Sequence, residues 1–378
     1  MKVLIAPDSF KDSLSSLEVG KAIEAGIRMA DPRIESEIFP LGDGGEGSAE
    51  ILGHHLKAEK WFLEVENAIG RPVEASYYFA DESKTAFIEM AEASGLQRIG
   101  IHERNCMLAS TYGTGQMIRH AINLGAKRVV LAIGGSATND AGMGMASALG
   151  IKLFDAKNNL LKGGGKELLI FHHFDEGGSF VPADLQVDII CDVDNPLYGN
   201  KGAAHVYARQ KGANDDDIEL LDKGLENFSK VMINQKGLNL ADVPGAGAAG
   251  GLGAGSMAFL NASLHKGIDV IMDITGFDQH LNGVDLIITG EGKIDSQTIH
   301  GKLIHGISRH ARQYSIPIIA LCGMLELEPE EVKKLGLNSA FSIQSKPRSL
   351  EEALQNTRKD LTRLAFNIMR LLNSIGNK

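Results

Sequence analysis

The sequence GGSATNDAGMG, at residues 134–144, carries more glycines and short polar side chains than an ordinary turn needs. It follows an apolar run that ends at Ile133 and precedes an apolar segment with helical spacing. Glycines leave the backbone uncovered, so its N–H groups can approach the oxygens of a phosphate or a carboxylate. The alternative is a plain turn with Asn139 or Asp140 as the helix N-cap, but a cap needs one polar residue and not four. We therefore expect this loop to bind a ligand.

Carboxylates stand beside glycines or hydroxyls in four other loops, each after an expected strand. Their sequences are APDSFKDSLS (6–15), PLGDGGEG (40–47), CDVDNPLYGNKG (191–202) and TGEGKIDSQTIHGK (289–302). Open α/β sheets bind ligands beyond the carboxyl ends of their strands, which is where these loops begin. Purely structural roles would also explain some of these residues, since Asp8 and Ser9 could cap a helix and Glu46 could interact favourably with a helix dipole. Asn195-Pro196 could likewise start a turn. Five such loops are hard to explain by turns alone.

Two aspartates at the end of the strand expected at 187–193 add a carboxylate pair. Asp192 and Asp194 repel each other unless a cation or a proton lies between them. In an extended segment, residues two apart point the same way, so both carboxylates could meet one cation. The run GAGAAGGLGAG at 245–255 leads into a helix. Either anion binding at the helix N-terminus or close helix packing explains its glycines, and the sequence leaves both open.

These parts are the ones that phosphoryl transfer requires. Mg²⁺ takes one or two carboxylates, phosphates take backbone N–H groups and lysines, and a hydroxyl nucleophile takes a carboxylate base. The sequence has no GxxxxGK[ST], HExxH, GxSxG or HRD motif, and GMGMAS at 142–147 is a poor match to GxGxxG.

Composition narrows the class of protein further. The net charge of −10 over 378 residues argues against nucleic-acid and anionic-membrane partners. The 3 cysteines are widely spaced and form no CxxC motif, which fits a reducing compartment. MKVLIAP is too short for a signal segment, and no apolar run is long enough to span a membrane. We expect a soluble cytoplasmic protein and leave open whether it is a homo-oligomer.

The elements that position these loops predict two α/β domains. Apolar strands are expected at 2–7, 35–40, 285–289, 317–322 and 338–343, with helices between them. Five parallel strands suit a doubly wound, flavodoxin-like sheet of order 2-1-3-4-5, built discontinuously from 1–60 and 284–378. Residues 61–283 form a large inserted mixed α/β domain, in which the alternation at 60–90 predicts antiparallel strands.

Six motifs in this order resemble the bacterial glycerate kinases that have a flavodoxin-like domain and a large insertion. They are APDSFKDSLS, DGGEG, GGSATNDAG, CDVDNPLYG with KGAA, GAAGGLGAG and TGEGKIDSQTIHGK. The resemblance implies transfer of the γ-phosphoryl of ATP to a hydroxyl of D-glycerate, usually giving 2-phosphoglycerate, with Mg²⁺ as cofactor.

Candidate roles follow from the motif positions. For the nucleotide we assign Gly134, Gly135, Ser136, Asn139, Gly250, Gly251 and Lys293. For the substrate we assign Asp8, Ser9, Lys11, Glu46 and Glu291. Asp192 is the expected catalytic base with Asp43 in reserve, and Asp194 and Asp295 are the expected metal ligands. Asn139 and Asp140 are expected to orient ligand hydroxyls or metal-bound water.

Two other classes could use the same loops. A nicotinamide- or nucleotide-sugar-using enzyme would bind its cofactor at the glycine turns and would release no ADP. A non-catalytic regulator would bind a sugar acid without turnover. The excess of carboxylates favours the kinase, because a pure anion binder would avoid them.

Overall fold

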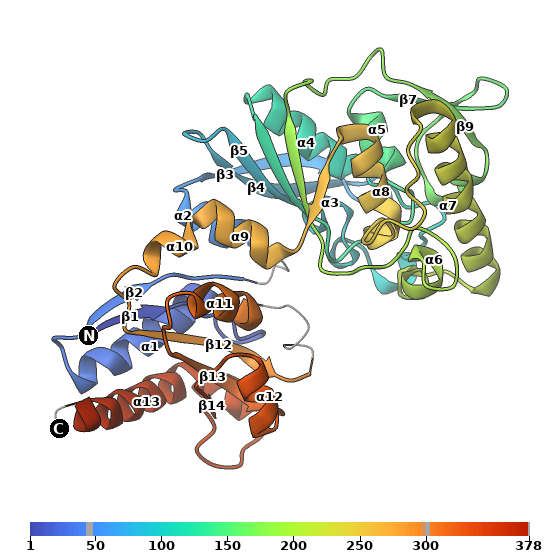
Figure 1. Cartoon of the computed structure of the whole chain (residues 1–378). Coiled ribbons are helices and arrows are strands. Elements are labelled where there is room, and N and C mark those ends of the chain that lie inside the picture. The colour runs from blue at the N-terminus through green and yellow to red at the C-terminus, as the bar shows by residue number, and fades with distance from the viewer. Residues whose placement is uncertain (43–47, 297, 299–302, 377–378) are drawn as a thin grey trace. The chain divides into compact units, whose positions relative to one another are not determined.

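The computed structural model describes residues 1–42, 48–296, 298 and 303–376. The chain divides into two compact units, drawn in Figure 1. The discontinuous unit comprises Met1–Asp43 and Ile268–Lys378, and the inserted unit comprises Gly44–Gly267. Among the helices of the described ranges, none is long and apolar enough to cross a membrane.

The discontinuous unit contains the expected five-stranded parallel sheet. Its strands are β1 (Lys2–Ile5), β2 (Glu35–Ile38), β12 (Leu286–Ile294), β13 (Ile318–Leu325) and β14 (Ser339–Ser342). Their order is β14-β13-β12-β1-β2, and every neighbouring pair is parallel. Renumbered within this unit, that order is 2-1-3-4-5, so the flavodoxin-like prediction is confirmed.

Helices of the discontinuous unit surround this sheet. They are α1 (Ser16–Ala30), α9 (Gly267–Thr275), α10 (Phe277–His280), α11 (Leu303–Arg312), α12 (Pro329–Lys334) and α13 (Leu350–Gly376). Ser15 caps α1, because its hydroxyl accepts the N–H of Glu18 while the Glu18 carboxylate accepts the N–H of Ser15. The cap is therefore Ser15 and not Asp8 or Ser9.

The inserted unit is built on a mixed six-stranded sheet. Its strands are β3 (Glu59–Glu66), β4 (Pro72–Ala80), β5 (Thr85–Glu89), β6 (Arg128–Ala132), β10 (Gln186–Ile190) and β11 (Ser263–His265), in the order β11-β10-β6-β5-β4-β3. β3, β4 and β5 pair antiparallel, as the alternation at 60–90 predicted, and the other pairs are parallel. A separate antiparallel sheet of β7 (Lys152–Asp155), β8 (Leu160–Leu161) and β9 (Phe171–Asp175) was not predicted.

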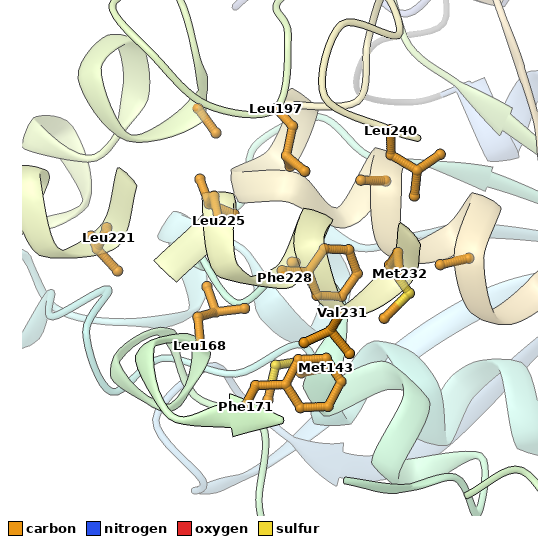
Figure 2. Packing of buried hydrophobic residues seen from close by; sticks show 14 of the residues in the cluster. Met143, Leu168, Phe171, Leu197, Leu221, Leu225, Phe228, Val231, Met232 and Leu240 are labelled. Carbon is orange, nitrogen blue, oxygen red and sulfur yellow. The ribbon is translucent and has the colours of Figure 1, made fainter. Parts of the chain in front are cut away.

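Helices of the inserted unit enclose its cores. They are α2 (Ser48–His55), α3 (Ala91–Ser94), α4 (Tyr112–Asn123), α5 (Met143–Ala148), α6 (Ala203–Tyr207), α7 (Asp215–Lys236) and α8 (Ala248–Leu260). Figure 2 shows Leu221, Leu225 and Phe228 following one another along α7 in a buried cluster. The Phe228 ring lies 6.0 Å, centroid to centroid, from both Phe171 and Phe259.

The limits of the units differ from the expected domain boundaries at 60 and 283. They fall at 43/44 and at 267/268. α2, which we expected in the first domain, belongs to the inserted unit, since a Cβ on its Gly53 would lie 2.6 Å from the ring of Tyr78 in β4. α9 and α10 belong to the discontinuous unit, where a Cβ on Gly306 of α11 would lie 2.5 Å from Ile268.

α1 and α13 lie side by side (Figure 1), and Gly26 permits their close approach. A Cβ on Gly26 would lie 2.3 Å from the carbonyl oxygen of Thr362 and 2.8 Å from the Cβ of Ala365. We expect Gly26→Leu to lower the free energy of unfolding by about 1–3 kcal/mol, because the added side chain overpacks this contact. Urea unfolding measures the change. Ala25→Leu, on the exposed side of α1, is the matched control. Equal losses in the two variants would contradict the close contact.

Candidate functional site

Two neighbouring strands of the inserted sheet bring two of the expected loops to the same edge. β6 and β10 run parallel, and Ala132 at the end of β6 is paired with Ile190 at the end of β10. Loop 134–140 follows β6, and loop 191–196 follows β10. Both loops therefore begin at the carboxyl edge of the sheet, the edge at which α/β proteins bind ligands.

Gly134 and Gly135 present exposed backbone at this edge. A Cβ on Gly134 would meet no described atom within 4 Å, so packing does not require glycine there. Gly135 has φ +73°, a conformation that favours glycine. The N–H of Leu96 donates to the carbonyl of Gly135 at 2.9 Å, and the N–H of Ala137 donates to the carbonyl of Ser94 at 2.9 Å. The loop is thus anchored on one side while its glycines stay accessible.

Asp140, the last residue of loop 134–140, is completely buried, and its carboxylate accepts four hydrogen bonds. One carboxylate oxygen accepts the N–H and the hydroxyl of Thr111, both at 2.8 Å, and the N–H of Gly144 at 3.2 Å. The other oxygen accepts the N–H of Gly142 at 3.2 Å. Burial raises the pKa of Asp140, and the hydrogen bonds from Thr111, Gly144 and Gly142 act in the opposite direction. Its oxygens cap the start of α5 and hold Thr111 at the start of α4, and a role of Asp140 in orienting a ligand stays a prediction.

Thr138 and Asn139 are buried polar residues of a different kind. The hydroxyl of Thr138 and both amide atoms of Asn139 have no hydrogen-bond partner among the described residues. Both side chains are 0% exposed. Buried polar groups are normally paired, so this part of the loop has hydrogen-bonding capacity for a water or a ligand. The nucleotide-binding role of Asn139 stays a prediction.

Lys211 donates hydrogen bonds to the same loop. Lys211 was not identified as a site residue from the sequence. It ends the short 3-10 helix η4 (Arg209–Lys211), and it is 2% exposed. Its ammonium donates to the hydroxyl oxygen of Ser136 at 2.6 Å and to the carbonyl of Thr138 at 2.8 Å. Burial lowers the pKa of Lys211 to about 8, while Cys106 and Asp140 act to raise it. A lysine in the polar stretch YARQKGAND carries no periodic signal that predicts burial.

The glycines at 250 and 251 serve close backbone packing. Ala249, Gly250 and Gly251 have left-handed backbone angles, so the regular part of α8 begins after them. A Cβ on Gly250 would lie 2.1 Å from the carbonyl oxygen of Thr138. The N–H of Ala141 donates to the carbonyl of Gly250 at 3.1 Å. The packing interpretation thus accounts for Gly250, and an anion-binding role for Gly250 and Gly251 stays a prediction.

Loop 191–196 carries the expected base. One carboxylate oxygen of Asp192 accepts the N–H of Gly267 at 3.0 Å, and Asp192 and Asp194 are both exposed. β10 ends at Ile190, so Asp192 and Asp194 follow the strand that we expected to continue to residue 193, and their alignment on one cation stays a prediction. Asn195 anchors the loop, because its carbonyl accepts the N–H of Gly247 at 3.0 Å and its side chain accepts the hydroxyl of Tyr207 at 2.6 Å.

In the discontinuous unit, the loop after β1 lies alongside the end of β12. The N–H of Asp8 donates to the carbonyl of Gly290 at 2.8 Å, and the Asp8 carboxylate accepts the N–H of Ser9 at 2.6 Å. A Cβ on Gly292 would lie 3.5 Å from the backbone nitrogen of Lys11, whose side chain is exposed. Three expected substrate-binding residues, Asp8, Ser9 and Lys11, are thus placed on one loop at the carboxyl edge of this sheet.

The charged side chains at the end of β12 contact other residues of the protein. Glu291 is buried and accepts the hydroxyl of Thr298 at 2.6 Å. Lys293 forms ion pairs with Asp295 at 3.3 Å and Glu326 at 2.7 Å. Hydrogen bonds to Glu326 and Asp295 raise the pKa of Lys293. An anion would have to compete with these two carboxylates for Lys293, and a metal ion would have to compete with Lys293 for Asp295.

Two expected site residues, Asp43 and Glu46, lie outside the described residues. Within the described ranges, no group of three or more His, Cys, Asp or Glu side chains is arranged to hold a metal ion. The exposed carboxylates of Asp192 and Asp194 would suit a cation that takes its other ligands from phosphates and water, as Mg²⁺ does in nucleotide sites. They do not fit a metal ion held by protein side chains alone.

The whole chain is similar to proteins of one family. The glycerate kinase family model matches residues 3–373. A glycerate kinase of Halalkalibacterium halodurans is 42% identical over 97% of both chains, and a glycerate 2-kinase of Escherichia coli is 40% identical over 97% of both. The chain belongs to the glycerate kinase family. The resemblance drawn from the six motifs is confirmed.

The fold agrees with a solved structure of this family. A crystal structure of a Salmonella typhimurium LT2 protein described as glycerate kinase 2 superposes with a TM-score of 0.92. The two chains are 39% identical, and the match covers 100% of both.

The hydrogen bonds of Asp140 predict that its replacement by asparagine lowers the stability of the protein. Asp140→Asn places amide hydrogens against the N–H groups of Thr111 and Gly144, or against that of Gly142. We expect a loss of about 1–3 kcal/mol in the free energy of unfolding, the range for a buried polar group left unsatisfied. Chemical denaturation measures it. Asp242→Asn, at an exposed loop position, is the matched control and should change the stability by less than about 0.5 kcal/mol. A similar, small change in both variants would show that the four hydrogen bonds are dispensable.

Proposed function

We propose that this protein transfers the γ-phosphoryl of ATP to a hydroxyl of D-glycerate, with Mg²⁺, and that the product is 2-phosphoglycerate. The observation that carries the proposal is the whole-length similarity to glycerate kinases, at 42% identity over 97% of both chains for one of them. The name of the Escherichia coli relative, glycerate 2-kinase, supports the 2-position as the acceptor. A cytoplasmic location is part of the same proposal.

The geometry of the inserted unit supports an anion-binding role for loop 134–140. Its exposed Gly134-Gly135 backbone can bring N–H groups to phosphate or carboxylate oxygens. Ser136 adds a hydroxyl, and Lys211 adds a positive charge behind it. These features can attract an anionic substrate locally, although the net charge of the whole protein is −10.

The carboxylates have distinct roles in this proposal. Asp192, oriented by the N–H of Gly267, accepts the proton of the substrate hydroxyl as the phosphoryl group arrives. Asp194 and Asp295 would hold Mg²⁺, which neutralises charge on the nucleotide phosphates when bound. Asp8, Ser9, Lys11 and Glu291 contact glycerate, together with Glu46 outside the described residues. That loops of both units act on the same substrates stays a prediction.

ADP release tests the proposed activity. With Mg-ATP and D-glycerate we expect steady ADP production that depends on both substrates and is abolished by EDTA. A panel of short hydroxy acids should define the acceptor, and phosphorus NMR of the product should match 2-phosphoglycerate and not 3-phosphoglycerate. Binding of glycerate without ADP release would favour the regulator. Stabilisation by NAD with no ADP release would favour the nicotinamide enzyme.

Replacement of Asp192 tests the base. Asp192→Asn keeps an oxygen that can accept the N–H of Gly267, so the loop should stay in place. We expect kcat to fall by about 10²–10⁴-fold, the typical contribution of a general base, while ATP still binds. Asp216→Asn, on the exposed start of α7, is the control. If Asp192→Asn turns over normally and Asp43→Asn does not, the base is Asp43. Normal turnover in both variants would rule out a carboxylate base at either position.

A further inference from the structure

Lys211 has a buried ammonium that contacts no carboxylate of the described residues. Its two hydrogen-bond acceptors are the Ser136 hydroxyl at 2.6 Å and the Thr138 carbonyl at 2.8 Å, and both are uncharged. Among the described residues, no ion pair to Lys211 is formed, and its side chain is 2% exposed. Burying a charge without a counter-ion is strongly unfavourable. The Asp140 carboxylate attracts this charge without contacting it, so the positive charge behind the glycine loop has no carboxylate within hydrogen-bond distance in the part of the chain that the structure describes.

The ammonium also fixes the direction of the Ser136 hydroxyl. A lysine ammonium has three donors and no acceptor, so the Ser136 oxygen must accept from it. The hydroxyl proton of Ser136 then has to be donated to another group. No described residue accepts that proton. Ser136 directly follows the exposed Gly134-Gly135 backbone, and the Ser136 residue itself is 6% exposed.

We propose that Lys211 is a positioning residue that holds the Ser136 hydroxyl as a donor to an anionic oxygen of a bound substrate. This inference rests on the proposed kinase activity, whose substrates carry anionic oxygens on two kinds of group, the phosphates of ATP and the carboxylate of glycerate. The positive charge acts on that anion across one hydroxyl group, in a water-poor setting where electrostatic attraction is strong. Lys211 itself does not touch the substrate.

Backbone hydrogen bonds hold Lys211 in this position. The N–H of Cys106 donates to the carbonyl of Lys211 at 3.2 Å, and the N–H of Lys211 donates to the carbonyl of Ala208 at 2.9 Å. Gly212 follows with φ +94°, and a Cβ on it would lie 2.1 Å from the carbonyl oxygen of Arg104. The lysine is therefore fixed at its base by close packing, and its side chain reaches the loop.

The charge of Lys211 can be titrated near neutral pH. Burial lowers the pKa of Lys211 to about 8, and the Cys106 thiol and the Asp140 carboxylate are the titratable groups that act on it. The ammonium is present below this pH and is lost above it. The Asp140 carboxylate accepts its hydrogen bonds from Thr111, Gly142 and Gly144 and does not contact Lys211. An anion beside Ser136 raises the pKa of Lys211 again, since opposite charges favour the charged form.

A double-mutant cycle tests the proposal. We expect Lys211→Met and Ser136→Ala each to lower kcat/KM by about 10- to 100-fold, the range for a hydrogen bond to a charged group. The double variant should be little worse than either single variant, because Lys211 acts through Ser136. A rise in KM for ATP identifies the phosphate as the anion, and a rise in KM for glycerate identifies the carboxylate. Lys223→Met, exposed on α7, is the matched control.

The pH profile provides a readout that a purely structural role would not change. Wild-type kcat/KM should fall as the pH rises through about 8, where Lys211 loses its proton. Ser136→Ala should lack this limb, which also keeps the test decisive if Lys211→Met does not fold. Additive losses in the cycle, or an alkaline limb that persists in Ser136→Ala, would overturn the proposal. Absence of ADP release by the wild-type protein would instead refute the proposed function.

Discussion

The carboxylate of Asp140 is the point on which the candidate site depends. It accepts four hydrogen bonds from Thr111, Gly142 and Gly144, entirely inside the protein. A buried carboxylate is tolerated only when its oxygens are satisfied, so these contacts lock the starts of α4 and α5 together. The loop that precedes α5 is held by the same contacts, and its exposed glycines therefore lie on a rigid support. Such support is what a binding loop needs if it is to meet its ligand already in shape.

Most parallel strands of the two sheets were predictable, because buried strands are apolar runs in the sequence. KVLIAP and PIIALC are of this kind, and the alternation at 60–90 identified the antiparallel part of the inserted sheet. β7, β8, β9 and β11 were missed, since strands of 4, 2, 5 and 3 residues show little or no period. The unit to which α2 belongs was also not predictable, because an apolar helix face can pack on either sheet. The contact of Gly53 with Tyr78, remote in sequence, decides it.

The loops of the site could be found from sequence, but not the function of every residue within them. Gly134 and Gly250 look alike in a sequence, yet a Cβ would be free of contacts at Gly134 and would strike the Thr138 carbonyl at Gly250. Asn139 and Asp140 are adjacent, yet only Asp140 has its hydrogen bonds satisfied by the described residues. Lys211 could not be found at all, because a lysine beside a glycine in a polar turn is normally exposed. Its burial arises from tertiary contacts with the segment at 104–106.

Amide hydrogen exchange of the 134–140 backbone tests most directly whether the exposed glycines bind substrate. The exchange is measured in the full chain, free and with saturating Mg-ATP, D-glycerate, or both. Peptides that cover Gly134 and Gly135 should gain protection when the anionic substrate binds, while peptides from β3 and β4, which are remote in sequence from the loop, should be unchanged. Substrate turnover without any gain of protection at 134–140 would contradict a binding role for this loop.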